Sequence, residues 1–399
     1  MRILMHHRIA SRDGQSVHLE EVLAALRRQG HDVMLIGPAS LATTRFGGES
    51  RLVDAIKRRL PAFAFELLEL AYNGPALLRL LRAIRRHRPE ILYERYSLFL
   101  FAGVLAARLS RLPLLLEVNS PLFEERAAHD GLRLRRLGRW SQRLLWRQAD
   151  HVLPVTGVLS GMIAESGVGR DRITVVPNGI DPDRFVAVAD GMAAKMALQI
   201  PQRLVLGFAG FVRGWNSVDR LIDFVAGHGD ELDLHVLVVG DGPASGSLLD
   251  HARRRGVADR LTITGVIARE DVAHYIAAFD IAVVPGVTPY ASPLKLFEYL
   301  QLGRPIIAPD TANIREILTD GHDALLFDPV SPDSLYQRLQ MLCEDPHLRA
   351  RLSVSARQTI IRRSLTWDEN AKRISSLASR LVTGSIQQIR VSRSGSGLA

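Results

Sequence analysis

The feature of this chain that most restricts its fold is an alternation of short apolar runs and amphipathic helical segments that occurs twice. The first series has apolar runs at Arg2–His6 and Val33–Ile36, which flank a helical repeat over Val17–Gln29. A second series starts at Leu204–Phe208 and continues to Pro305–Ala308. Strands that alternate with helices form parallel sheets covered by helices. The sequence therefore predicts an α/β protein of two doubly wound, Rossmann-like domains that face each other across a cleft.

The boundary between the two series is marked by the segment PNGIDPDRF, which ends at Phe185. Its two prolines, one glycine and two Asp are typical of a loop or linker. A length of 399 residues is sufficient for two hydrophobic cores. We predict a first domain over residues 1–185 and a second over residues 186–365. Residues 384–399 are rich in Ser, Gly and Arg and are predicted to form a disordered tail.

The net charge of +9 is distributed unevenly along the chain. Residues 1–150 hold 25 Lys+Arg and 15 Asp+Glu, whereas residues 151–399 hold 26 and 27. The segment 133–147 places Arg among Leu and Trp at helical spacing, which predicts a helix with a cationic and an apolar face. Such a helix can bind an anionic membrane surface, or it can be a solvated basic face above the core. No recognition motif accompanies the charge, so we predict no nucleic-acid partner.

Cysteine use and hydropathy bear on the compartment. The single cysteine, Cys343, excludes an internal disulfide framework and fits a reducing environment. The opening run MRILM is too short for the apolar part of a signal peptide. The longest apolar stretches contain Arg or Glu before they reach membrane-spanning length. We therefore predict no transmembrane helix and a cytoplasmic location, with a possible peripheral contact with the inner face of the membrane.

The motif SPLKLFEYL, which starts at Ser292, is the sharpest candidate site. Ser292 as N-cap and Pro293 at the first position predict a helix start. The free amides of Leu294 and Lys295, the helix dipole and the Lys295 ammonium together favour a bound anion. Glu298 follows on the same side and can accept hydrogen bonds from ribose hydroxyls. The alternative is an exposed Lys–Glu pair worth ~0.3–0.5 kcal/mol, but the surrounding apolar residues favour burial and hence a ligand.

A glycine-rich turn and several polar residues have weaker interpretations. Gly240, Gly242 and Gly246 follow an apolar run, and a tight turn beside a nucleotide site is favoured over a nicotinamide site. The histidines at positions 6, 7 and 18 are expected to lie on loops and a helix surface rather than to bind metal. The DPD sequence at 181–183 is interpreted as part of a turn. No pair of carboxylates with metal-binding spacing follows a suitable predicted strand. No metal site and no cofactor are predicted.

Five motifs occur in a characteristic order: VVPNGID, GFAGFVRGW, VVGDGP, SPLKLFEYL and LGRPIIA. In this order and at this spacing the chain resembles the retaining nucleotide-sugar glycosyltransferases of family 4, which have the GT-B fold. The resemblance covers nearly the whole chain except the tail. It implies that the second domain binds the sugar donor and the first domain the acceptor. It also implies that a helix over residues 366–383, beginning near Trp367, packs back on the first domain.

The resemblance assigns roles to individual residues. The turn Pro293–Lys295 matches the helix start that binds the donor diphosphate, and Glu298 matches the glutamate that holds the ribose. Val266 falls where the nucleobase usually rests on backbone groups. Gly14 lies in the loop that usually approaches the donor phosphates and sugar.

Three of the named positions depart from the family pattern. Tyr290 stands where the family has a first glutamate. Asn216 stands where the family has a lysine in the first donor loop, and Arg213 is expected to supply the missing positive charge as a bidentate phosphate ligand. Asn119 falls near the usual active-site histidine, and both Glu117 and Asn119 are expected to bind the sugar or the acceptor.

The implied reaction moves a sugar from a nucleoside diphosphate to an acceptor hydroxyl with retention, in polysaccharide or glycolipid assembly. Lys295, Arg213 and the helix amides would stabilise the diphosphate leaving group, with Asn119 on the opposite domain. Neither a protein nucleophile nor a metal is required, and the acceptor would be a sugar or a lipid-linked sugar. Two alternatives remain open: a nucleotide-sugar epimerase and a catalytically inactive nucleotide-sugar-binding protein.

Overall fold

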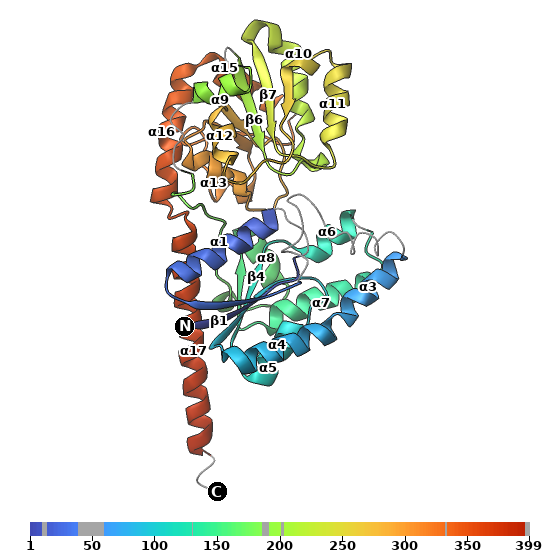
Figure 1. Cartoon of the computed structure of the whole chain (residues 1–399), viewed down its shortest axis with the longest axis vertical. Helices are drawn as coiled ribbons and strands as arrows, with labels where there is room; N and C mark the ends of the chain where they lie inside the picture. The colour runs from blue at the N-terminus through green and yellow to red at the C-terminus, as the bar shows by residue number, and fades with distance from the viewer. Residues whose placement is uncertain are drawn as a thin grey trace. The chain divides into compact units, whose positions relative to one another are not determined.

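The computed structural model divides the chain into two compact units (Figure 1). It describes residues 1–9, 14–38, 60–129, 131–185, 191–200, 203–331 and 333–395. The first unit contains Met1–Pro177 together with the helix that begins at Trp367, and the second contains Asn178–Thr366.

The boundary falls after Pro177 rather than at 185, because the linker-like segment belongs to the second unit. Ile180 and Phe185 are buried in the hydrophobic core of that unit. The Ile180 backbone amide also donates a hydrogen bond of 3.1 Å to the carbonyl oxygen of Leu365. The turn-forming residues of this segment therefore shape a surface loop of the second unit, while its apolar residues anchor the loop.

The first unit contains a five-stranded parallel sheet with the order β2-β1-β3-β4-β5. The strands are β1 (Arg2–His6), β2 (Asp32–Ile36), β3 (Ile91–Arg95), β4 (Leu114–Val118) and β5 (His151–Pro154). This order is that of a flavodoxin-like sheet, whose topological switch point lies between β1 and β3. Strands β3, β4 and β5 are buried along their whole length, as expected for a parallel sheet covered on both faces.

Helices cover both faces of this sheet. They are α1 (Gly14–Arg28), α3 (Ala62–Ala71), α4 (Asn73–His87), α5 (Ala102–Ser110), α6 (Leu122–His129), α7 (Arg135–Gln148), α8 (Gly157–Glu165) and α17 (Trp367–Gly395). Helices α4, α5 and α7 lie on one face, and α1 packs with α17 on the other (Figure 1).

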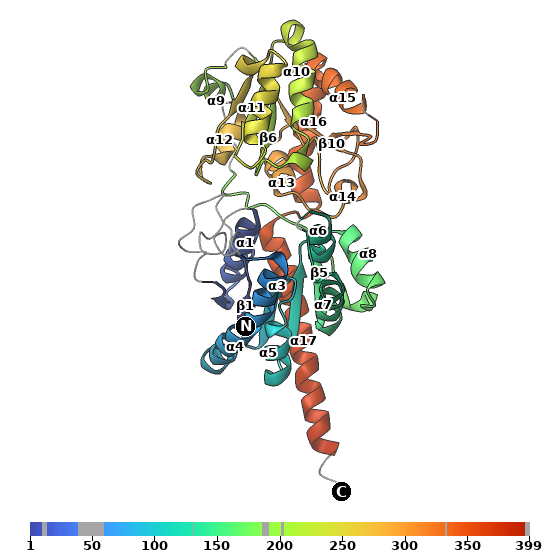
Figure 2. The ribbon, with the colours of Figure 1, turned by 90° about the vertical axis from the view of Figure 1, so that its right-hand side faces the viewer.

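The C-terminal helix α17 is longer than the sequence predicts. It runs as one helix from Trp367 to Gly395 (Figure 2), so the expectation of a disordered tail is wrong for residues 384–395. This stretch has no proline to end the helix, and the cost of Gly384 within a helix is only about 1 kcal/mol. The Asn370 side-chain amide donates to the carbonyl oxygen of Pro177 at 2.6 Å, which fixes the first turns of α17 to the first unit.

The second unit contains a six-stranded parallel sheet with the order β11-β10-β9-β6-β7-β8. The strands are β6 (Leu204–Ala209), β7 (Leu234–Val239), β8 (Leu261–Ile263), β9 (Ile281–Val283), β10 (Ile306–Pro309) and β11 (Leu325–Phe327). Read from β8, this is the strand order 3-2-1-4-5-6 of dinucleotide-binding sheets, whose switch point here lies between β6 and β9. In such sheets ligands bind outside the carboxyl ends of the strands at the switch point.

The sheet of the second unit lies between two hydrophobic cores. Its helices are α9 (Gly191–Ala197), α10 (Asp219–Leu232), α11 (Ser245–Arg254), α12 (Val272–Ala277), α13 (Leu294–Gln301), α14 (Ala312–Arg315), α15 (Ser334–Glu344) and α16 (Pro346–Arg362). Strand β6 alternates between the cores, since Val205 belongs to the cluster under α13 and Leu206 to the cluster under α10.

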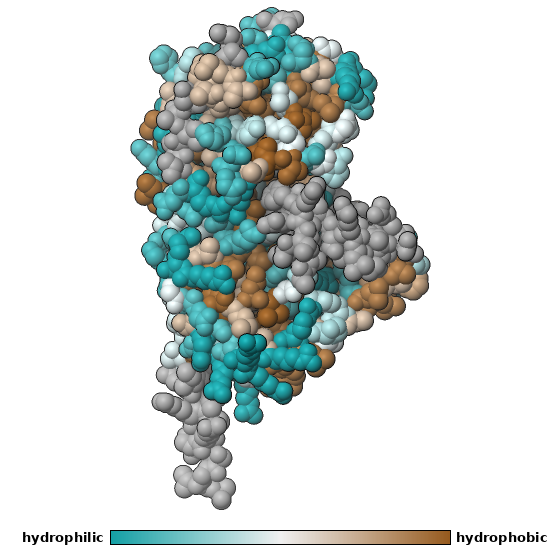
Figure 3. All heavy atoms as spheres, in the orientation of Figure 1, coloured by the Kyte–Doolittle hydropathy of each residue, from teal (hydrophilic) through white to brown (hydrophobic). Residues whose placement is uncertain are grey.

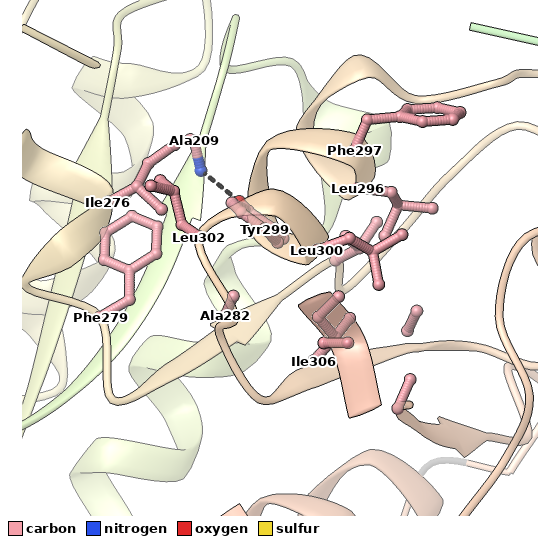
Figure 4. Close-up of a cluster of buried hydrophobic side chains, with 14 of the residues drawn as sticks. Ala209, Ile276, Phe279, Ala282, Leu296, Phe297, Tyr299, Leu300, Leu302 and Ile306 are labelled. Atoms are coloured by element: carbon pink, nitrogen blue, oxygen red, sulfur yellow. Dashed lines mark hydrogen bonds between the residues drawn. The ribbon is translucent and has the colours of Figure 1, made fainter. Parts of the chain in front are cut away.

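The cluster under α13 fixes that helix against β6. Tyr299 is completely buried, and its hydroxyl accepts a hydrogen bond of 2.7 Å from the Ala209 backbone amide (Figure 4). Burial raises the pKa of the Tyr299 hydroxyl well above its ordinary value, so the group stays neutral. This bond ties the last residue of β6 to α13 and thereby holds the first turn of α13 at the switch point.

Candidate active site

The loops after β6 and β7 in the second unit pack backbone against backbone. Gly240 has a φ of +135°, and a Cβ there would collide with the carbonyl of Gly210. A Cβ on Gly242 would collide with the backbone of Val212 in the same way. The glycine-rich turn is therefore the tight turn that the sequence predicts, and its glycines allow close approach of two loops at the carboxyl edge of the sheet.

Lys295 lies in the first turn of α13, and no described residue forms an ion pair with it. Its Nζ lies 3.6 Å from the centroid of the Phe208 ring, at the end of β6. The side chain is partly buried, and it makes no hydrogen bond or ion pair with any described residue. Burial lowers the pKa of Lys295 to about 7, although the charge of Glu298 opposes this shift. An anion bound here would supply the missing counter-charge.

Glu298 lies one turn further along α13 and is likewise partly buried. No ion pair joins it to Lys295 within the described chain, so the exposed-pair alternative does not describe the site. Burial raises the pKa of Glu298 to about 7, although the charges of Lys295 and Arg269 oppose this shift. The carboxyl group is therefore near its titration point at neutral pH and can accept or donate a hydrogen bond.

The helix start differs in detail from the prediction. The N-cap of α13 is Pro293 rather than Ser292, and no side chain caps the helix. The Ser292 hydroxyl accepts a hydrogen bond of 3.1 Å from the Asn178 backbone amide, so it is engaged by a residue distant in sequence. The amides of Leu294 and Lys295 belong to the first turn, where a helix offers no internal acceptor.

Arg213 and Asn216 lie in the loop that follows β6. The exposed Arg213 guanidinium lies between two aromatic rings, with its Cζ 4.9 Å from the centroids of both Phe211 and Trp215. The side-chain oxygen of Asn216 accepts a hydrogen bond of 2.9 Å from the Arg213 amide and so holds the turn. Asn216 is buried, and the structure gives it a loop-shaping contact; its donor-binding role stays a prediction.

Val266 and Gly14 lie at or near the ends of secondary-structure elements. Val266 follows β8 and is 51% exposed, after Gly265 with a φ of +72°. Gly14 is the exposed first residue of α1 in the first unit. Both therefore leave backbone groups accessible, as a backbone-mediated contact requires, and their roles stay predictions.

Asn119 in the first unit follows β4 and donates its side-chain amide to Glu117. The buried Glu117 carboxylate also accepts hydrogen bonds from the Tyr93 hydroxyl and from Arg95, at 2.9 Å for Arg95. The Nε2 atom of His18, in α1, lies 3.1 Å from the Oε2 atom of Glu117. Burial alone would raise the pKa of Glu117, but these charges and hydrogen bonds outweigh it and hold the pKa well below the ordinary range.

His6, His7 and His18 are buried, which corrects the expectation that they lie on loops and a helix surface. His6 Nδ1 lies 2.7 Å from Glu94 at the β1–β3 switch point. Burial lowers the pKa of His7 to about 4, and the Ile9 amide donates to its Nδ1 at 3.1 Å. No group of three or more His, Cys, Asp or Glu side chains within the described ranges is arranged to hold a metal ion.

Sequence reasoning missed the partners of Glu117, namely His18, Tyr93 and Arg95. The available signal was the apolar run Ile91–Tyr93, which Glu94 and Arg95 follow directly in the sequence. Its meaning depended on the strand order, because only the sheet brings β3 beside β4 and places α1 near both.

Comparison with known families agrees with this geometry. Residues 12–184 match the model described as Glycosyltransferase Family 4, and residues 203–345 match the model described as Glycosyl transferases group 1. The chain belongs to the family 4 glycosyltransferases. It is therefore a glycosyltransferase, and the alternatives of an epimerase or an inactive binding protein receive no support.

Relatives of this glycosyltransferase are similar over most of their length. A GDP-mannose-dependent alpha-mannosyltransferase from Mycobacterium tuberculosis is 27% identical over 366 residues, 88% of this chain and 89% of the relative. A 2-deoxystreptamine glucosyltransferase from Streptomyces kanamyceticus is 24% identical over 354 residues, 83% of this chain and 89% of the relative.

Solved structures share the fold of this glycosyltransferase. Anabaena HepE in complex with UDP has a TM-score of 0.76 at 17% identity, covering 95% of this chain and 100% of that one. WaaG, from lipopolysaccharide biosynthesis, has a TM-score of 0.67 at 15% identity, covering 94% and 99%. Together with the two parallel sheets, these neighbours confirm the predicted GT-B fold class. The arrangement of the two units across a cleft stays a prediction.

Proposed function

We propose that this glycosyltransferase moves a hexose from a nucleoside diphosphate sugar to an acceptor hydroxyl, with retention of configuration. The observation that carries the proposal is the Lys295 ammonium, which lies at the switch point of the second unit with an aromatic ring beside it. Among the residues that the structure describes, no carboxylate forms an ion pair with it. A diphosphate is the dianionic group that the proposed donor brings to such a site.

The proposed chemistry stabilises the leaving diphosphate. As the glycosidic bond breaks, negative charge grows on the phosphate oxygen that departs with the nucleotide. Lys295 and the free amides at the start of α13 would bind that charge, and Arg213 would add a second cation. Glu298 would accept hydrogen bonds from the ribose hydroxyls. The acceptor proton would pass to the leaving phosphate on the same face of the sugar, which gives retention without a protein nucleophile.

A metal ion is not needed in this scheme, because Lys295, Arg213 and the helix dipole supply the positive charge that a metal would provide. The proposed reaction therefore uses no metal and no further cofactor, and a chelator is expected to leave the rate unchanged.

The donor base and sugar are proposed from the relatives. GDP-mannose is the first candidate, because the mycobacterial relative that covers most of this chain is named for that donor. UDP-glucose is the second, because the neighbour HepE has been solved in complex with UDP-glucose. The acceptor is proposed to be a sugar or lipid-linked sugar in polysaccharide or glycolipid assembly.

The first unit is proposed to bind an anionic membrane surface. Helix α7 exposes a row of arginines at helical spacing, Arg135, Arg139, Arg143 and Arg147, and buries its other face. The segment just before α7 contacts α3, since Glu66 of α3 accepts hydrogen bonds from the amides of Arg133 and Leu134 at 2.8 and 2.7 Å.

Helix α3 adds an apolar surface beside that basic row. Phe63, Leu67 and Leu68 are 52%, 50% and 48% exposed. Figure 3 shows apolar side chains gathered over α3. Cationic and apolar groups side by side fit a lipid surface with acidic headgroups, which would bring the protein to a lipid-linked acceptor. No described helix is both long and apolar enough to cross a membrane.

The proposed function is tested by nucleotide titration followed by product analysis. We expect GDP or UDP, with the matching nucleotide sugar, to bind without added metal, and Lys295→Met to weaken binding about 10- to 100-fold. Lys372→Met is the matched control, because Lys372 is an exposed lysine of α17 paired with Glu369. Nuclear magnetic resonance of the product should show the anomeric configuration of the donor. Equal nucleotide binding by Lys295→Met and the control would contradict the proposal.

A further inference from the structure

The Glu117 carboxylate stands at the centre of a polar cluster in the first unit. Donors reach it from three elements: Tyr93 and Arg95 of β3, His18 of α1, and Asn119 after β4. The side chain of Glu117 is 4% exposed, whereas Asn119 is partly exposed. The buried charge is therefore satisfied inside the protein, and Asn119 is the member of the cluster that reaches the surface.

The chemistry of a carboxylate fixes the orientation of Asn119. An ionised carboxylate accepts hydrogen bonds and cannot donate them, so the amide nitrogen of Asn119 must face Glu117. The carboxamide oxygen of Asn119 then faces away from the cluster. The two ends of an Asn side chain are similar in size, and without such a partner the group could turn over.

We propose that Glu117 is a positioning residue for glycosyl transfer, which holds Asn119 so that its carboxamide oxygen accepts a hydrogen bond from a sugar hydroxyl. Asn119 lies just beyond the carboxyl end of β4, the strand next to β3 of the switch point, and ligands of open α/β sheets bind at the carboxyl edge. An amide oxygen is not a base at neutral pH, so its task is to orient the sugar rather than to remove a proton. The inference rests on the proposed function.

The cluster is suited to hold one orientation over a wide pH range. His18, Tyr93 and Arg95 all face the carboxylate, and together they keep it ionised. Trp367 of α17 packs edge-on against His18, with ring centroids 5.1 Å apart, which supports the imidazole from the other side. The cluster therefore provides a fixed acceptor rather than a titrating one.

The decisive experiment reverses the donor and the acceptor. Asn119→Asp places two carboxylates against each other, so we expect kcat/KM to fall about 100-fold at pH 8 and to recover as the pH falls and the pair shares a proton. In the double variant Glu117→Gln with Asn119→Asp, the amide introduced at position 117 can donate to the new carboxylate, which again leaves an oxygen facing outward. We expect kcat/KM of the double variant at pH 8 to be at least about tenfold higher than that of Asn119→Asp.

The change in KM shows which substrate carries the hydroxyl group that Asn119 contacts. A KM change for the nucleotide sugar assigns it to the transferred sugar, and a KM change for the acceptor assigns it to the acceptor. Asp323→Asn is the matched control, because Asp323 is a buried carboxylate of the second unit that accepts hydrogen bonds from the Thr319 amide and the Thr359 hydroxyl instead. That control should keep the wild-type kcat.

Three results would overturn the inference. The first is a double variant that is no more active than Asn119→Asp although both variants melt at the wild-type temperature. The second is an Asn119→Ala variant with full activity. The third is an Asn119 side-chain amide resonance that is unchanged in the Glu117→Gln variant. The resonance is measured without turnover, so it tests the orientation even if no nucleotide sugar is consumed. Absence of turnover in the wild type with every donor would instead refute the proposed function.

Discussion

Binding of the sugar donor should be coupled to protonation of Lys295. Burial lowers the pKa of this lysine to about 7. Roughly one Lys295 side chain in ten is therefore protonated at pH 8, and roughly nine in ten at pH 6. A bound diphosphate stabilises the charged form and raises this pKa. If only the charged form binds, the affinity should fall about tenfold from pH 6 to pH 8, with about 0.9 proton taken up at pH 8.

Glu298 must be separated from this effect, because its pKa is raised to about 7 and its ionisation would release a proton as Lys295 takes one up. The Glu298→Gln variant removes that release. It also removes the negative charge that raises the pKa of Lys295, so the midpoint of the affinity curve should move below pH 7. The sign of this second shift follows from the loss of the negative charge of Glu298, which favours the protonated form of Lys295.

The assay is isothermal titration calorimetry with GDP-mannose or UDP-glucose and no acceptor, in buffers that differ in ionisation enthalpy. A nucleotide sugar is preferred to a free diphosphate, because its phosphates do not titrate between pH 6 and pH 8. Glu298→Gln should show the full proton uptake, and Lys295→Met should show none. Zero uptake at pH 8 in Glu298→Gln, or the same pH dependence in both variants, would refute the reasoning.

Four further predictions follow from single contacts. Gly210→Ala should weaken donor binding and cost about 1–2 kcal/mol of stability, since Gly210 has a φ of +127° and its Cβ would lie 3.3 Å from the Lys295 Nζ; calorimetry and thermal melting measure both effects. Tyr299→Phe should lower the free energy of unfolding in denaturant by about 1–3 kcal/mol, because the Ala209 amide loses its acceptor. Dialysis against EDTA should leave turnover unchanged, and a loss restored by Mg²⁺ would show that a metal is required. Arg139→Gln with Arg143→Gln should reduce flotation with anionic liposomes at low salt, while Arg253→Gln with Arg254→Gln on the second unit should not.

Much of the fold could be predicted because its signals are local. Strands β1, β2 and β6 lie where the sequence analysis places apolar runs, and α13 begins within one residue of the predicted start. The misplaced domain boundary and the continued α17 have a common cause. Loop-forming and polar residues indicate a break in regular structure, but they do not say which core buries Ile180 or whether a helix continues past Gly384.

The candidate site was likewise predictable only where its signals are local in the sequence. The spacing of Lys295 and Glu298 already places two charges on one side of a helix. The histidines were misjudged because burial is set by neighbouring strands, and His6, His7 and His18 are covered by elements distant in sequence.

The sequence by itself determined two parallel sheets, the helix start that carries Lys295, and the family, because each depends on periodicity or motif order along the chain. Only the tertiary structure decided that Lys295 lies against Phe208 with no ion pair to a carboxylate in the described part of the chain, and that Glu117 accepts hydrogen bonds from β3, α1 and the end of β4. The physical reason is that strand order in a parallel sheet is set by crossover connections and packing, which bring together the ends of strands that the sequence leaves far apart.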